Sequence, residues 1–220
     1  SCLASTRRPG NCDDSVFHVR INFQKYTTKR NLVKILIFCY TALTNMNILS
    51  IETSCDETAI SIMKVSGGIK KPSFSILANN VSSQIDIHKE FGGVFPAVAK
   101  REHTKAIFPL TIKTLKEAKL YSENKKIIPL DKKVCKKIRE ICSHEQELAE
   151  SLIEILPTIK KPKIDYIAIT TGPGLEPALW VGINFAKSIS LAFNIPLIPT
   201  NHMEGHVLSS LFKEKKVAKG

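Results

Sequence analysis

The order of the predicted strands and helices is the feature that most constrains the fold of this chain. Three short apolar segments, at residues 48–51, 59–63 and 74–78, are separated by turn-forming residues and predict strands in meander order. Further along, a strand at 166–170, a mostly apolar helix at 178–193 and a second short strand form a βαβ pattern. A meander and a βαβ unit together predict an α/β fold, or an α+β fold with a mixed sheet.

Two helices are predicted between these groups of strands. Residues 98–118 carry apolar side chains near helical spacing, and Pro109 is expected to bend this helix or divide it into two pieces. The highly charged stretch 119–162 contains another apolar stripe, which predicts one long amphipathic helix ending before Pro157. The stripe consists of Val134, Ile138, Ile141, Leu148, Leu152 and Ile155.

Composition excludes several classes of protein. With 43% apolar residues the 220-residue chain can form a packed core. No apolar run reaches the roughly 18 residues of a membrane-spanning helix. The six cysteines include no Cys-x-x-Cys pair, which favours reduced thiols in a cytosolic protein over a disulfide framework. The net charge of +12 is compatible with a polyanionic partner, but the basic residues of 119–139 are not accompanied by a base-stacking aromatic pattern and predict a solvated helix face.

Residues 1–45 differ from the rest of the chain, because they carry seven Lys or Arg against two Asp. We expect them to be upstream sequence joined to a start at Met46 or, alternatively, an organellar transit peptide. The expected domain covers 46–212, with a charged helical insert at about 120–160 and a truncated tail at 213–220. The expected compartment is the cytoplasm, or a mitochondrion or plastid if the leader is a transit peptide.

The strongest chemical signal is the histidine pair in His202-Met-Glu-Gly-His206. On a helix, residues four apart differ by roughly 40° around the axis, so both imidazoles can bind one metal ion. The alternative is that the pair is solvated or caps a helix. Glu204 points to the other side of such a helix, unlike the Glu of the zinc-protease pattern His-Glu-x-x-His, so a metalloprotease is disfavoured. Because two His are an incomplete site, a third ligand, an Asp or Glu for a borderline metal, must come from elsewhere.

Two loops are candidates for binding a nucleotide. The loop 171–175, Thr-Gly-Pro-Gly-Leu, lies between a strand and a helix, where backbone amides can bind phosphate. The alternative is a tight turn in which Gly172 and Gly174 supply unusual φ angles. The segment 52–58, Glu-Thr-Ser-Cys-Asp-Glu-Thr, places three acids and three hydroxyls between two strands, where they can bind phosphate or a metal. The alternative there is a polar β-turn.

Three further residues have weaker signals. Cys55 has no His close to it in the sequence, so we expect a small packed residue rather than a nucleophile. His88 and His103 flank the segment Phe-Gly-Gly-Val-Phe-Pro at 91–96, and we expect both to be structural or exposed rather than ligands.

Taken in order, these motifs resemble the bacterial TsaD family of tRNA N6-adenosine threonylcarbamoyltransferases, formerly described as O-sialoglycoprotein endopeptidases. The resemblance covers residues 46–212 apart from the charged insert, and it rests on the segments 48–59, 82–96, 171–175 and 201–206. Four motifs in the same order are more specific than any one of them.

The resemblance implies an actin-like ATPase (ASKHA) fold, in which this chain is an N-terminal fragment that supplies the first lobe and lacks most of the second. It implies that His202 and His206 bind one divalent metal, iron rather than zinc, whose third ligand in the family is an Asp with no counterpart here. It also implies a bound nucleotide, either ATP, ADP or the adenylate substrate. The residues expected to bind nucleotide or substrate are Thr53, Ser54, Asp56, Gly172 and Gly174. Glu57 is the candidate catalytic residue, because its carboxylate can order a water molecule or a metal.

The implied reaction transfers a threonylcarbamoyl group from threonylcarbamoyl-AMP to the exocyclic amine of the tRNA adenosine 3′ of the anticodon. The implied partners are tRNA and TsaB-like and TsaE-like subunits, with no membrane, and the fragment is expected to be inactive alone. Two alternatives stay open. One is a non-catalytic tRNA-binding or assembly subunit of the same fold, which would need no metal ligands. The other is a related carbamoyltransferase with a different acceptor.

Overall fold

The computed structural model describes residues 45–67 and 73–209. The predicted leader, apart from its last residue, and the predicted tail lie outside this part of the chain. The elements in chain order are β1 (Asn45–Glu52), β2 (Glu57–Ser66), β3 (Ser73–Ser83), α2 (Ile85–Lys89), α3 (Pro96–Glu117), α4 (Lys132–Ile141), α5 (Gln146–Ile155), the short 3-10 helix η3 (Leu156–Thr158), β4 (Tyr166–Gly172), α6 (Glu176–Phe193), β5 (Leu197–Asn201) and α7 (His202–Ser209).

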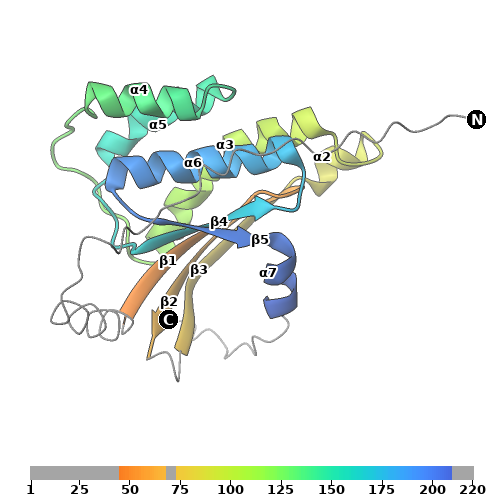
Figure 1. The fold of residues 1–220 in the computed structure, drawn as a ribbon, viewed down its shortest axis with the longest axis horizontal. Coiled ribbons are helices and arrows are strands. Elements are labelled where there is room, and N and C mark those ends of the chain that lie inside the picture. Colours follow the sequence, from red (N-terminus) through yellow and green to blue (C-terminus); the bar gives the residue numbers. More distant parts are fainter. Residues whose placement is uncertain (1–44, 68–72, 210–220) are drawn as a thin grey trace, which may run out of the picture. The chain divides into compact units, whose positions relative to one another are not determined.

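The five strands form one mixed sheet in the order β3-β2-β1-β4-β5 (Figure 1). β1, β2 and β3 are antiparallel neighbours, whereas β4 and β5 run parallel to β1. The register aligns side chains that face the helices: Leu49 is opposite Ile62 on one side and Ile167 on the other, and all three are buried. The predicted fold class, a mixed α/β sheet with flanking helices, is confirmed.

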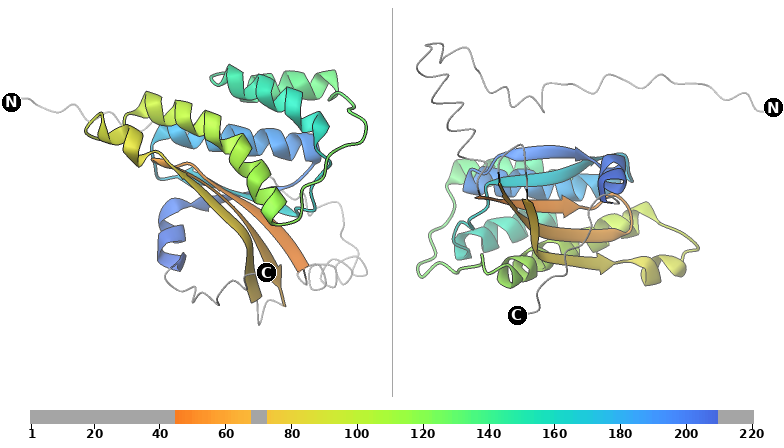
Figure 2. Two further views of the ribbon diagram at one scale, coloured as in Figure 1. Left: turned by 180° about the vertical axis from the view of Figure 1, so that it is seen from behind. Right: turned by 90° about the horizontal axis from the view of Figure 1, so that it is seen from below.

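Helices cover one face of this sheet. α3 and α6 pack directly on it, and α4 packs against α5 and α6. Figures 1 and 2 show these four helices on one side of the sheet and α7 on the other. The hydrophobic core therefore lies between the sheet and the helical layer. Its largest fully buried side chains include Ile51, Ile60, Ile62, Ile107, Ile138, Leu148, Leu152, Ile167 and Phe185.

The prediction of one long helix over 134–155 is wrong. Two helices, α4 and α5, are joined by a turn that contains the buried residue Glu145. The Glu145 carboxylate forms an ion pair with Lys100 Nζ at 2.9 Å and accepts a hydrogen bond from Asn184 Nδ2 at 2.8 Å. Ile138 and Leu152 then both reach the core, which brings the two halves of the apolar stripe onto the same surface. Tertiary packing thus overrides the local periodicity.

The expectation that Pro109 divides α3 is also wrong, because α3 is one continuous helix from Pro96 to Glu117. Its path changes direction along its length, as the left view of Figure 2 shows. Buried residues on both sides of the proline, Ile107 and Thr111, fix the helix to the core. A second proline, Pro96, occupies the first position of α3 and favours the observed start of the helix, because its missing N–H needs no partner there. No helix among the described residues has the length and apolar character required to span a membrane.

Candidate functional site

The candidate site lies where the parallel strands end. Glu52 is the last residue of β1, Thr170 lies near the end of β4, and His202 follows β5. Because the carboxyl ends of parallel strands meet at the same edge of a sheet, these three side chains come together. A cavity of about 350 Å³ lies next to them on the face of the sheet that carries α7.

Glu52 is the centre of the hydrogen-bond network at this edge. Its Oε2 accepts a hydrogen bond from Thr170 Oγ1 at 2.6 Å and lies 3.3 Å from His202 Nδ1, while Oε1 accepts from the Ser54 backbone N–H at 2.6 Å. Burial of Glu52 raises its pKa, but the hydrogen bonds from Ser54, Thr170 and His202 outweigh this effect and hold the pKa below its usual value. The carboxylate is therefore ionised at neutral pH.

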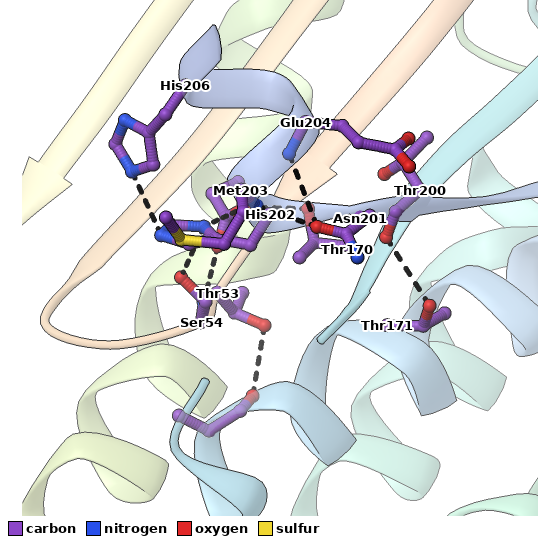
Figure 3. Close-up of polar contacts among 12 residues, drawn as sticks. Thr53, Ser54, Thr170, Thr171, Thr200, Asn201, His202, Met203, Glu204 and His206 are labelled. Carbon is purple, nitrogen blue, oxygen red and sulfur yellow. Dashed lines mark hydrogen bonds and ion pairs between the residues drawn. The ribbon is translucent and has the colours of Figure 1, made fainter. Parts of the chain in front are cut away.

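The two predicted metal ligands face each other across one turn of α7. His202 Nε2 lies 2.9 Å from His206 Nε2, and Figure 3 shows this contact together with the neighbouring Ser54. Ser54 Oγ lies 3.1 Å from His202 Nδ1. Because the Glu52 carboxylate can only accept, Nδ1 of a neutral His202 carries the proton and donates it, which leaves the Nε2 lone pair directed toward His206.

The start of α7 is fixed by a side-chain cap. Asn201 Oδ1 accepts hydrogen bonds from the backbone N–H groups of Met203 and Glu204, at 2.8 and 3.2 Å. The Glu204 side chain lies on the side of the helix away from His206, as Figure 3 shows and as the helical spacing predicts. The cap therefore directs the two histidines to one side and the acid to the other.

The donor set is compatible with a metal ion but incomplete. The described residues contain no group of three or more His, Cys, Asp or Glu that could hold a metal. His202 and His206 supply two converging imidazole nitrogens, and Glu52 binds the outer nitrogen of His202 in the way that second ligand shells orient a metal-binding histidine. The two histidines thus fit one part of a metal site.

The other sequence-predicted site residues of the first loop have different surroundings. Thr53 is fully buried, and its Oγ1 donates to the Ala178 carbonyl at 2.9 Å, so its hydroxyl is directed into the packing against α6. Ser54 contacts His202, whereas Asp56 is half-buried. Glu57 is exposed at the start of β2 and makes no contact with the histidine pair.

The two glycines of the second loop have different roles. Gly172 has a φ of +144°, a backbone conformation that favours glycine. The alternative of a tight turn with unusual φ angles does not hold for Gly174, where glycine is needed because there is no space for a Cβ. A Cβ at Gly174 would lie 2.7 Å from the carbonyl oxygen of Ser54. Leu175 N–H donates to that same carbonyl at 2.6 Å, so this loop and the turn 53–56 are in direct contact.

The expectations for the isolated thiol and imidazoles are partly confirmed. Cys55 is exposed, so the prediction of a packed residue is wrong. Partial burial and the neighbouring Asp56 raise the pKa of its thiol, which argues against a reactive thiolate. His88 and His103 are buried and structural, with exposed fractions of 3% and 0%.

Sequence reasoning missed two residues of the site, Glu52 and Thr170. It selected Glu57 from the three acids of the first loop, but the fold places Glu52 beside His202. A usable signal was present, because both missed residues lie at the ends of predicted strands that precede a loop. In a sheet with parallel neighbours, such positions converge.

Comparison with known proteins identifies the family. The model of the family "TsaD: tRNA N6-adenosine threonylcarbamoyltransferase" matches residues 75–129 and 138–219, more than half of the chain. The chain belongs to the TsaD family. It is 39% identical over 168 residues to the tRNA N6-adenosine threonylcarbamoyltransferase of Fusobacterium nucleatum, and 36% identical over 170 residues to that of Persephonella marina. The family resemblance expected from the four motifs is confirmed.

The matches to these TsaD proteins cover only part of each relative. They include 76% and 77% of this chain but 36% of each relative, so the chain spans about a third of the length of the curated proteins it matches. Among solved structures, YeaZ from Pseudomonas aeruginosa aligns with a TM-score of 0.34 at 12% sequence identity, covering 71% of this chain and 44% of YeaZ.

Proposed function

We propose that this chain carries part of the active site of a tRNA threonylcarbamoyltransferase. The reaction transfers the threonylcarbamoyl group of threonylcarbamoyl-AMP to the exocyclic amine of the tRNA adenosine 3′ of the anticodon, and AMP leaves. The observation that carries the proposal is the pair of facing Nε2 atoms of His202 and His206, 2.9 Å apart, on a chain of the TsaD family.

The chain's own residues orient the first of these imidazoles. Glu52 and Ser54 hold the Nδ1 side of His202, which fixes both the ring orientation and the tautomer. Thr170 donates to Glu52 and keeps the carboxylate directed at the ring. Because Glu52 is ionised, it also stabilises any positive charge that develops on His202.

The histidine pair would hold a divalent metal, iron rather than zinc, as two ligands of a larger set. When bound, the metal supplies a Lewis acid for the carbonyl of the transferred group. The alternative of a scaffold protein without chemistry is disfavoured, because a scaffold needs no converging imidazoles oriented by the half-buried carboxylate of Glu52.

The two contacting loops are the proposed site for the nucleotide. Ser54, Asp56 and the loop with Gly172 and Gly174 offer hydroxyl, carboxylate and backbone groups for polar parts of the adenylate or of ATP or ADP. Thr53 supports these loops from the inside, since its hydroxyl bonds to the Ala178 carbonyl. The catalytic role of Glu57, ordering a water molecule or a metal, stays a prediction.

The proposed partners follow from membership of the family. We propose that tRNA is the acceptor and that TsaB-like and TsaE-like subunits assist the reaction in the cytoplasm. The 220-residue chain alone is proposed to be inactive, since the described residues hold only part of a metal site.

A reconstituted modification assay tests the proposal. The chain is extended with the C-terminal part of its relatives and supplied with partner proteins, threonine, bicarbonate, ATP and unmodified tRNA. We expect the modified nucleoside in tRNA digests, with a loss of more than about 100-fold in His202→Ala, above the roughly 10–100-fold typical of residues that only support a metal ligand. Glu154→Gln, which changes an exposed acid on α5 away from this cavity, is the control. Absence of modification by a metal-loaded protein would reject the proposal.

A further inference from the structure

The turn 53–56, which carries Ser54, is held from three directions. Three consecutive backbone carbonyls of this turn each accept a hydrogen bond from a different part of the fold. The pairs are Leu175 N with Ser54 O at 2.6 Å, His103 Nε2 with Cys55 O at 3.0 Å, and Gln84 N with Asp56 O at 2.9 Å. Two of the donors are backbone amides, so His103 is the one side-chain donor among them.

His103 lies on α3, has no exposed surface and uses both of its ring nitrogens. Nε2 faces the Cys55 carbonyl, and Nδ1 lies 2.7 Å from Thr58 Oγ1. Because a carbonyl can only accept, Nε2 must carry the proton, and the Thr58 hydroxyl then donates to Nδ1. Burial lowers the pKa of His103 and favours this neutral tautomer.

The same turn touches the histidine pair from its other side. Ser54 Oγ lies 3.1 Å from His202 Nδ1, and the Ser54 N–H donates to the carboxylate of Glu52, which also contacts His202 (Figure 3). His103 and His202 therefore act on opposite sides of one short segment. A displacement of the Cys55 carbonyl would shift Ser54 and with it the hydrogen bond that fixes the His202 ring.

We propose that His103 is a positioning residue for the histidine pair. The hydrogen bond from His103 Nε2–H to the Cys55 carbonyl holds the turn 53–56 in place. From this position Ser54 and Glu52 direct His202 Nε2 toward His206. Both ring nitrogens of His103 are used within the fold, by the Cys55 carbonyl and the Thr58 hydroxyl, so His103 acts on the pair through the turn. This inference rests on the proposed function where it concerns metal binding, but its statement about the His202 ring does not require a metal.

Two substitutions separate this role from a general contribution to stability. In His103→Gln the amide nitrogen takes approximately the place of Nε2 and can still donate to the Cys55 carbonyl. In His103→Asn the shorter amide can accept from Thr58 but does not reach Cys55. Each variant keeps one of the two hydrogen bonds, so both are expected to lose stability by similar amounts. Only the asparagine variant releases the turn.

The first readout is metal affinity, with Fe²⁺ or Zn²⁺ alone titrated into the full-length protein. We expect His103→Asn to bind about 10–100-fold more weakly, as is typical when a group that orients a metal ligand is lost, and His103→Gln to bind within about threefold of the parent. Thr111→Val is the matched control. Thr111 is buried on the same helix, α3, and its hydroxyl donates to the Ile107 carbonyl of that helix rather than to the turn, so the metal affinity of this variant should not change.

The second readout is the tautomer of His202, measured by nitrogen-15 NMR without metal. We expect the Nδ1–H form in the parent and in His103→Gln, and a mixture of tautomers in His103→Asn. If His103→Asn does not fold, His103→Leu, which keeps the buried volume and removes both bonds, replaces it. An unchanged His202 tautomer in His103→Asn, or in His103→Leu if that variant replaces it, would overturn the inference. Failure of the parent to bind metal, with the tautomer change still present, would instead count against the proposed function alone.

Discussion

The two segments that supply the candidate site, the turn 53–56 and helix α7, are held in very different ways. Thr53 and Ser54 are buried, and backbone carbonyls of the turn are anchored by three separate parts of the fold. α7 buries none of its described residues and is fixed mainly by the Asn201 cap and the contacts of His202. The side that orients the imidazole is therefore preorganised by the core, whereas the position of His206 depends on α7 remaining helical.

The largest effect is expected from the second histidine of the pair. His206→Ala removes one of two converging nitrogens, so metal affinity should fall by more than about 100-fold, above the range of supporting residues. His206 is exposed, so thermal stability without metal should hardly change. Metal content of the purified full-length protein measures the first effect, and Glu204→Ala serves as the control on the same helix. Equal metal content in His206→Ala and the parent would contradict the ligand assignment.

A pair of glycine substitutions compares the two segments directly. Gly174→Ala places a methyl group 2.7 Å from the Ser54 carbonyl, so the turn or the loop must move, and we expect a loss of about 1–3 kcal/mol in unfolding free energy. In α7, an added Cβ at Gly205 meets nothing within 4 Å, so Gly205→Ala should stabilise the helix by about 0.5–1 kcal/mol.

Urea unfolding of both glycine variants measures this difference. Each variant adds the same methyl group, so the test is whether the unfolding free energy falls in Gly174→Ala and rises in Gly205→Ala. A loss at Gly205 as large as the loss at Gly174 would show that α7 is packed as tightly as the turn.

The sequence predicted the parts of this molecule that depend on local patterns. Alternating apolar residues such as Leu49 and Ile51 marked the strands, and the spacing of His202 and His206 predicted that their imidazoles meet. Both depend only on the geometry of one element, with a period of two or of 3.6 residues. The turn 53–56 was also found in the right place, between two strands.

The parts that were missed depend on contacts between distant segments. The predicted long helix is interrupted between Ile141 and Gln146, where Lys100 and Asn184 from other helices bind the carboxylate of Glu145. Gly174 is needed because Ser54, far away in sequence, approaches it. Periodicity contains no information about such partners, so these features follow only once the fold brings the segments together.

The smallest expected effect concerns the pH dependence that Glu52 gives to the anchored segment. Its pKa in the folded chain lies below its usual value, since hydrogen bonds from Ser54, Thr170 and His202 outweigh the effect of burial. The folded state therefore binds fewer protons than the unfolded chain near pH 4, so the stabilisation is present above the unfolded pKa of about 4.3 and is lost as pH falls toward the folded pKa.

Replacing the carboxylate by an amide removes this titration. Glu52→Gln should be less stable than the parent at pH 7, and the difference between the two proteins should shrink as the pH falls from about 5 to 3, through the usual range of a glutamate. Urea unfolding at a series of pH values measures it, and Glu204→Gln, whose acid is directed away from the network, controls for the loss of one negative charge. If the difference in unfolding free energy between the parent and Glu52→Gln stays constant with pH, the charge of Glu52 does not contribute to stability. The turn would then be anchored by its backbone carbonyls without help from the charge at the end of β1.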